Sequence, residues 1–131
     1  MKAQDKSEYI AYRISKAEET LLAAKELANK NYWNSCVNRL YYALFYAVNA
    51  LLINDGVIAK SHTGVKTQFF QLYIKTGKIN IKFGQLYSDL IDWRQKGDYN
   101  DFFDLSQEEV LPLLEPVEIF IQKIKVLLNL A

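Results

Sequence analysis

The residues best suited to chemistry lie in one short stretch, WRQKGDY at 93–99. We expect Arg94 in the last turn of a helix, where a cation interacts favourably with the negative end of the helix dipole. The glycine of the stretch would let the chain reverse, so that Asp98 and Tyr99 fold back towards Arg94 or towards Arg39. Such a cluster either forms an ion pair that fixes a loop to the core, or lets Arg94 bind phosphate while Tyr99 contacts a nucleotide.

Arg39 needs a partner of opposite charge. It stands in a strongly apolar segment, and an unpaired buried guanidinium is costly. Asp98 is the predicted partner. With Lys60 and Arg94, these two residues form the predicted ligand-binding set.

His62 is the single histidine of the chain. It is either a surface or capping residue or, because it follows Lys60 and Ser61, part of an anion-binding turn at the start of a helix. One histidine excludes a ribonuclease that uses two histidines of the same chain, although a dimer could bring two copies together. His62, Arg94 and Tyr99 are therefore the candidate catalytic residues.

Charged residues are unevenly distributed, although the net charge of the 131-residue chain is only +1. The segment 57–88 contains five lysines and no acidic residue, whereas 89–118 contains nine acidic residues against two basic ones. This asymmetry indicates either a surface that meets a polyanion, or two segments that complement each other within the fold or across a dimer.

Several kinds of site are disfavoured by the residue pattern. The chain has no Glu-x-x-His for a di-iron site in a bundle, and no glycine-rich phosphate loop or nucleophile elbow. We expect neither a metal nor a cofactor. The lone Cys36 suits a reducing compartment, and the first residues lack the pattern of a signal peptide. A cytoplasmic protein of one domain, residues 1–131, is expected.

The element that must position these residues is the segment 32–54, YWNSCVNRLYYALFYAVNALLIN. It contains no proline or glycine, and after Arg39 it carries no charge. A helix that is apolar nearly all round is one surrounded by protein. Its length would suit a membrane span, but Asn38, Arg39, Asn49 and four tyrosines argue against lipid. Gly56 is expected to end this central helix.

Four further helices are predicted at 7–29, 64–75, 83–96 and 106–130. Ser7 and Ser106 are the expected caps of the first and last of these. Pro112 and Pro116 should bend the last helix or delay its start, and Gly97 should end the helix at 83–96. Because no strand-like alternation is long enough to build a sheet, the chain is predicted to be all-α, an up-and-down bundle of four to five antiparallel helices.

Five motifs follow one another over nearly the whole chain. They are AEETLLAAKEL at 17–27, NRLYYALFYA at 38–47, SHTGV at 61–65, KTGKI at 75–79 and RQKGDY at 94–99. In this order they resemble the HEPN domain family (higher eukaryotes and prokaryotes nucleotide-binding), in particular its small single-domain prokaryotic members. The resemblance implies a helical bundle that forms a homodimer, with a small nucleotidyltransferase as partner in toxin–antitoxin or defence modules.

The resemblance also implies an activity. Many members of the family are metal-independent endoribonucleases that use an Arg-x4–6-His motif at the end of a helix, assembled at the dimer cleft. Arg94 matches the arginine, but Tyr99 stands where Arg-x4-His would place histidine. RNA cleavage by the neighbouring 2′-hydroxyl needs a base and an acid with pKa values near the working pH, and a tyrosine ordinarily titrates near ~10. The sequence therefore predicts weak or absent catalysis.

Three functions are left open. The leading hypothesis is a dimeric nucleotide- or RNA-binding component of a nucleotidyltransferase/HEPN toxin–antitoxin-like or defence module. One alternative is an active metal-independent endoribonuclease toxin, in which His62 would have to lie close to Arg94. The other is a purely structural dimerisation module.

Overall fold

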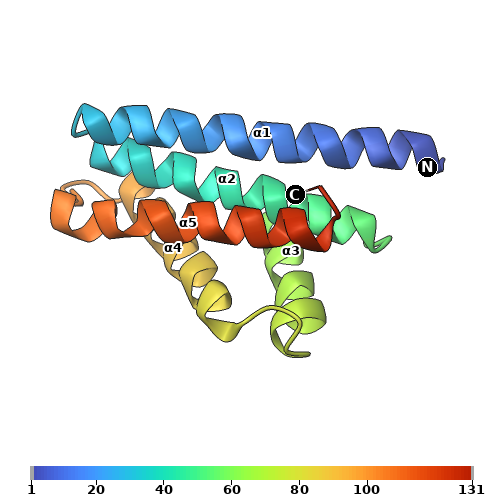
Figure 1. Ribbon diagram of the computed structural model, residues 1–131. Coiled ribbons are helices and arrows are strands. Elements are labelled where there is room, and N and C mark those ends of the chain that lie inside the picture. Colours follow the sequence, from blue (N-terminus) through green and yellow to red (C-terminus); the bar gives the residue numbers. More distant parts are fainter. Residues whose placement is uncertain (1, 131) are drawn as a thin grey trace.

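The computed structural model describes residues 2–130 and contains, within them, five α-helices and one short π-helix. The elements are α1 (Ala3–Asn29), α2 (Trp33–Asn54), α3 (His62–Phe69), η1 (Phe70–Ile74), α4 (Ile81–Tyr99) and α5 (Gln107–Leu127). The predicted all-α bundle is confirmed. Three long helices, α1, α2 and α5, lie side by side, whereas α3 and α4 extend away from α2 and are joined at their far ends (Figure 1).

The core is centred on α2, as the sequence predicted. Leu40, Tyr41 and Leu44 are among its largest fully buried side chains. By length and composition α2 could cross a bilayer, but 67% of its most apolar window is buried inside the bundle. The apolar pattern of this helix therefore reflects contact with protein on most of its circumference.

The C-terminal end of α2 is fixed by a Schellman motif. The backbone N–H of Gly56 donates to the carbonyl of Ile53 (3.0 Å), and that of Val57 donates to the carbonyl of Leu52 (2.9 Å). Gly56 has φ +76°, a left-handed conformation that glycine adopts without steric cost. The predicted end of the central helix is confirmed.

Of the two predicted helix caps, Ser106 is confirmed and Ser7 is wrong. Ser61 caps α3, and Ser106 forms the predicted capping box of α5. Ser7 caps nothing, because α1 already begins at Ala3. The prolines of α5 do not delay its start, since the helix begins at Gln107 directly after its cap.

The C-terminal end of α4 also differs from the predicted one. Gly97 does not reverse the chain, because α4 continues through it to Tyr99. The helix ends three residues later than predicted, and the chain that follows is held by Asn34 of α2. The side-chain amide of Asn34 donates to the carbonyl of Phe103 (2.7 Å) and accepts from the N–H of Leu105 (2.9 Å). These two bonds tie the α4–α5 loop to the central helix.

The two glycines should respond to alanine in opposite ways. At Gly97 a Cβ would meet Asn34 at ordinary contact distances of 3.6–3.7 Å, so Gly97→Ala should stabilise the protein by about 0.5–1 kcal/mol. At Gly56 a side chain must adopt positive φ, and Gly56→Ala should destabilise it by roughly 1–2 kcal/mol. Urea unfolding followed by circular dichroism measures both changes. A destabilising Gly97→Ala would show that α4 ends where the sequence predicted.

Candidate functional site

Tyr41, in the middle of α2, contacts two of the predicted site residues at once. Its ring lies under the guanidinium of Arg94, with the Cζ atom 4.8 Å from the ring centroid. Its hydroxyl shares a hydrogen bond with Nδ1 of His62. Arg94 lies near the C-terminal end of α4, and His62 is the first residue of α3. The fold therefore brings together an arginine and a histidine that lie on different helices.

Two further aromatic rings complete this group. The imidazole of His62 stacks on Phe45, with ring centroids 4.3 Å apart, and meets Tyr42 edge-on at 5.8 Å. Arg94 also lies over the Tyr42 ring, at 5.6 Å. A cation held against aromatic faces is stabilised by the ring quadrupoles. We call His62, Arg94, Tyr41, Tyr42 and Phe45 the Tyr41 cluster.

The charge of Arg94 is incompletely compensated. The side chain is only 11% exposed, and its one ion pair in the part of the chain that the structure describes is with Asp98, at 3.6 Å between Nη1 and Oδ2. Its Nε atom is buried and has no hydrogen-bond acceptor among those residues. A buried donor without an acceptor carries a desolvation cost. Arg94 therefore has unused capacity to bind an anion.

Burial and the charge of Arg94 set the protonation states of the cluster. Burial raises the pKa of Tyr41 to about 12, against the opposing effect of Arg94, so Tyr41 keeps its proton at neutral pH. Burial also raises the pKa of Tyr87, which stacks on Tyr41, well above its ordinary value. Desolvation and the nearby Arg94 lower the pKa of His62. The imidazole is therefore neutral at pH 7.

The geometry leaves one nitrogen of His62 available. Nδ1 is engaged by Tyr41, and within residues 2–130 no hydrogen bond involves Nε2. His62 as a whole is solvent-exposed. A neutral imidazole with one free nitrogen next to a fixed guanidinium can bind a phosphate and exchange a proton with it or with its ester.

The predicted ion pair between Arg39 and Asp98 is wrong. Because α4 stays helical, Asp98 lies one turn after Arg94 and pairs with that residue instead. Asp98 also accepts a hydrogen bond from the side-chain amide of Asn38 (3.0 Å). Arg39 donates to the carbonyl oxygen of the same amide (2.8 and 3.0 Å) and lies over the Tyr42 ring at 5.0 Å. Its burial is compensated by an amide and an aromatic face, without a carboxylate.

The other predicted site residues lie apart from the cluster centre. Tyr99 is 75% exposed and makes no hydrogen bond or aromatic contact with any described residue. Lys60 is exposed and lines, together with His62, a separate cavity. Tyr41 and Phe45 belong to the segment 32–54, which was predicted to be surrounded by protein and was assigned no role in the site. Their four-residue spacing beside Arg39 was the available signal that one face of α2 holds cations against aromatic rings.

Comparison with known proteins agrees with the motif order. The family model of the HEPN domain matches residues 10–127. This chain belongs to the HEPN family. The predicted family resemblance is therefore confirmed.

Three HEPN relatives align over most of the chain. A "UPF0332 protein" of Thermotoga maritima is 36% identical over 125 residues, covering 95% of each chain. "Putative toxin MJ0142" of Methanocaldococcus jannaschii is 34% identical over 112 residues, 86% of this chain and 76% of its own. "Putative toxin MJ0605" of the same organism is 32% identical over 122 residues, 93% of this chain and 90% of its own. The HEPN domain found here thus has relatives named as toxins.

The electrostatic coupling within the Tyr41 cluster can be measured at His62, whose single imidazole gives unambiguous ring-proton signals. A pH titration by NMR should give a pKa below the ordinary value of ~6.5. Arg94→Gln should raise this pKa, because it removes the positive charge that disfavours the imidazolium ion.

Lys96→Gln is the matched control for this titration. Lys96 lies on the same helix as Arg94 and is paired with Asp92 (3.0 Å). Unlike Arg94, it does not contribute to the lowered pKa of His62. Its substitution should leave the pKa unchanged. An equal rise in both variants would mean that His62 responds to overall charge and not to contact with Arg94.

Proposed function

We propose that this HEPN protein is a toxin-like module that binds RNA or a nucleotide through a phosphate group at Arg94. The observation that carries the proposal is the position of the guanidinium, held over two tyrosine rings with one long ion pair. A guanidinium fixed in this way loses little further conformational freedom when it binds a phosphate. It also offers the phosphate several hydrogen-bond donors. Asp98 would be displaced or shared on binding.

The cellular setting is part of the proposal. We propose a cytoplasmic homodimer that acts with a nucleotidyltransferase in a toxin–antitoxin or defence module. The support comes from the HEPN family itself and from the relatives named as toxins. Segment 57–88 contains five lysines and no acidic residue, and these lysines would add electrostatic attraction for a polyanion.

Catalysis by one chain is proposed to be weak or absent. Cleavage of RNA by its own 2′-hydroxyl needs one group to accept a proton and another to deliver one to the leaving oxygen. His62 could do one of these at a time. Tyr41, with a pKa of about 12, and Tyr99, whose side chain is 75% exposed and has no described contact with the cluster, are poor candidates for the other.

One observation favours the second candidate, a metal-independent endoribonuclease. Arg94 and His62 contact the same tyrosine. The ribonuclease hypothesis requires these two residues to lie close together. In the tautomer whose Nδ1–H donates to the Tyr41 hydroxyl oxygen, the free Nε2 of a neutral His62 would take the proton of the 2′-hydroxyl. Arg94 would stabilise the negative charge that develops on the phosphate oxygens. The proton for the leaving oxygen would then come from a second copy of His62 across a dimer, in its imidazolium form.

Binding is tested with fluorescently labelled single-stranded RNA in an anisotropy titration. Saturable binding that weakens as salt is added is expected. Arg94→Ala should weaken it about tenfold or more, because a charge-assisted contact to phosphate is lost, whereas Lys96→Ala should change it much less. RNA that binds neither the native protein nor the variants would favour the purely structural dimerisation module.

Activity is tested separately, with the same RNA and with cells in which the protein is induced. A binding module should leave the RNA intact and allow growth. Cleavage and growth arrest that disappear in both Arg94→Ala and His62→Gln would instead establish the ribonuclease. In that case the two variants mixed in equal amounts should also stay inactive, because the proposed cleavage needs His62 from both chains and each mixed dimer has only one.

A further inference from the structure

A cavity of about 710 Å³ lies beside the Tyr41 cluster and has no role in the chemistry described so far. It is enclosed by the N-terminal half of α1, the second half of α2 and the connection that leads to α3. Two side chains, Phe45 and His62, belong to both the cavity and the cluster. The volume lies within the usual range for small-molecule sites, roughly 300–1,000 Å³.

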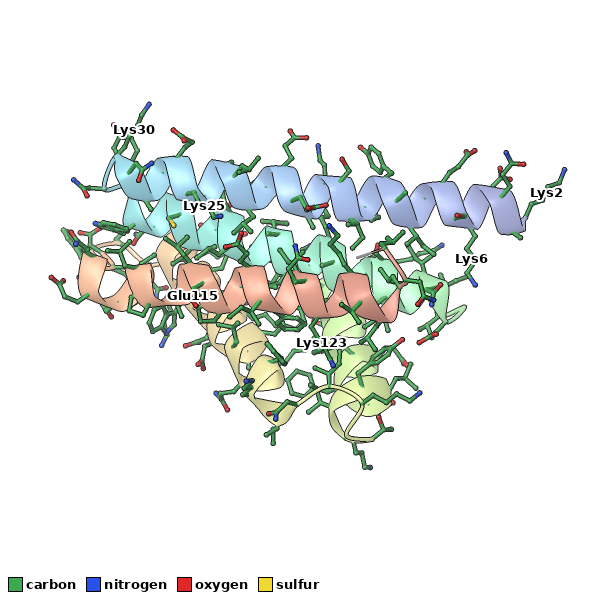
Figure 2. All side chains as sticks on the ribbon, in the orientation of Figure 1. Lys2, Lys6, Lys25, Lys30, Glu115 and Lys123 are labelled. Carbon is green, nitrogen blue, oxygen red and sulfur yellow. The ribbon has the colours of Figure 1, made fainter. Side chains whose placement is uncertain are left out.

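The cavity lining is cationic. Lys6, Arg13 and Lys60 contribute to it beside the neutral His62, and no acidic side chain of residues 2–130 does. Lys6 reaches down from α1 towards the α2–α3 connection, whereas Lys2 points outwards (Figure 2). A concave surface with several cations and no carboxylate attracts an anion.

Arg13 is held in place without a charge partner. Its guanidinium lies over the rings of Tyr9 (5.1 Å) and Tyr46 (5.5 Å), and Nη2 donates to the hydroxyl of Tyr9 (2.7 Å). Within residues 2–130 it forms no ion pair, and its buried Nε has no acceptor. Folding has therefore fixed a half-buried cation at the cavity wall without a carboxylate partner among the described residues.

Asn49 is the one buried amide side chain of α2 and also lines the cavity. It is 7% exposed, and no hydrogen bond in the described part of the chain uses its side chain. A polar group in an otherwise apolar helix costs stability unless it finds a partner. Phe45 and Ile53 lie one turn before and one turn after Asn49 on α2, and they line the same cavity with apolar surface.

We infer that this cavity binds one nucleoside monophosphate unit, either free or as part of single-stranded RNA. The base would lie against Phe45 and Ile53, and the donor and acceptor of the Asn49 amide would pair with its edge, as asparagine does with a nucleobase. Arg13, Lys6 and Lys60 would meet the phosphate. The apolar ring surface, the amide edge and the cations that a nucleotide needs therefore all line one cavity.

This inference rests on the proposed function for the RNA context but uses different residues. Because His62 and Phe45 form part of both sites, a nucleotide in the cavity would lie next to the Tyr41 cluster. The cavity would select the base, and Arg94 would bind a neighbouring phosphate. Nucleotide binding in the cavity and phosphate binding at Arg94 can therefore be disproved independently of each other.

Isothermal titration calorimetry with the four ribonucleoside 5′-monophosphates tests the cavity. Ribose 5-phosphate and inorganic phosphate serve as ligands without a base. We expect one nucleotide per chain, differences among the four bases, and at least about tenfold weaker binding of ribose 5-phosphate, since the base contacts are missing. Equal binding of nucleotides and inorganic phosphate would overturn the inference.

Asn49→Leu separates binding from folding. It should weaken the preferred nucleotide about tenfold or more and remove the differences among bases, while the thermal unfolding temperature stays the same or rises, because no side-chain hydrogen bond within residues 2–130 is lost and leucine adds apolar surface. A structural role for Asn49 would instead lower that temperature. Unchanged nucleotide affinity in this variant would overturn the inference.

Lys6→Gln and its control Lys2→Gln give a second test, because neither lysine forms an ion pair with another described residue. Lys6→Gln should weaken nucleotide binding several-fold, and Lys2→Gln should not.

The same variants titrated with a short single-stranded RNA show whether the cavity takes a free nucleotide or a unit of RNA. Weaker binding of both ligands by Lys6→Gln assigns RNA, and weaker binding of mononucleotides alone assigns a free ligand. RNA binding that falls in Arg94→Ala but not in Asn49→Leu or Lys6→Gln, with no mononucleotide bound, would keep the proposed function and reject the cavity.

Discussion

The whole site depends on one buried tyrosine that is kept neutral. Tyr41 lies in the middle of the most buried helix, so its ring cannot move without disturbing the core. Through its face it fixes the guanidinium of Arg94, and through its hydroxyl it fixes the imidazole of His62. Since burial keeps its pKa at about 12, it adds no negative charge. The positive charge of Arg94 is therefore positioned by Tyr41 but not neutralised by it.

The sequence predicted the helices well where the hydrophobic pattern was long and the end signals were local. The apolar stripes of α1 and α2, the left-handed Gly56 and the capping box of α5 depend on neighbouring residues and were read correctly. Gly97 was misread because its effect depends on a distant contact. A glycine often ends a helix, but here Asn34 of α2 packs against it and binds the following loop, so the helix continues.

The candidate site was predictable in its parts but not in its arrangement. Arg94 and His62 stood out by residue type, whereas their proximity depends on how α3 leaves α2 and α4 returns to it (Figure 1), and no local pattern encodes that. The error about Arg39 has the same origin. A buried cation was assumed to need a carboxylate, yet the fold supplies an amide and a tyrosine face, which a sequence rich in aromatic residues can provide at many positions.

His62 occupies the boundary between two cationic environments, and this position constrains its chemistry. Burial and the guanidinium of Arg94 both disfavour the imidazolium ion and lower the pKa of His62. An anion bound in the cavity would oppose both effects and favour protonation of His62. By linkage, protonation of His62 would then favour the anion to the same extent. A single imidazole held at Nδ1 by Tyr41 and free at Nε2 can therefore report, and respond to, whether the cavity beside it is occupied.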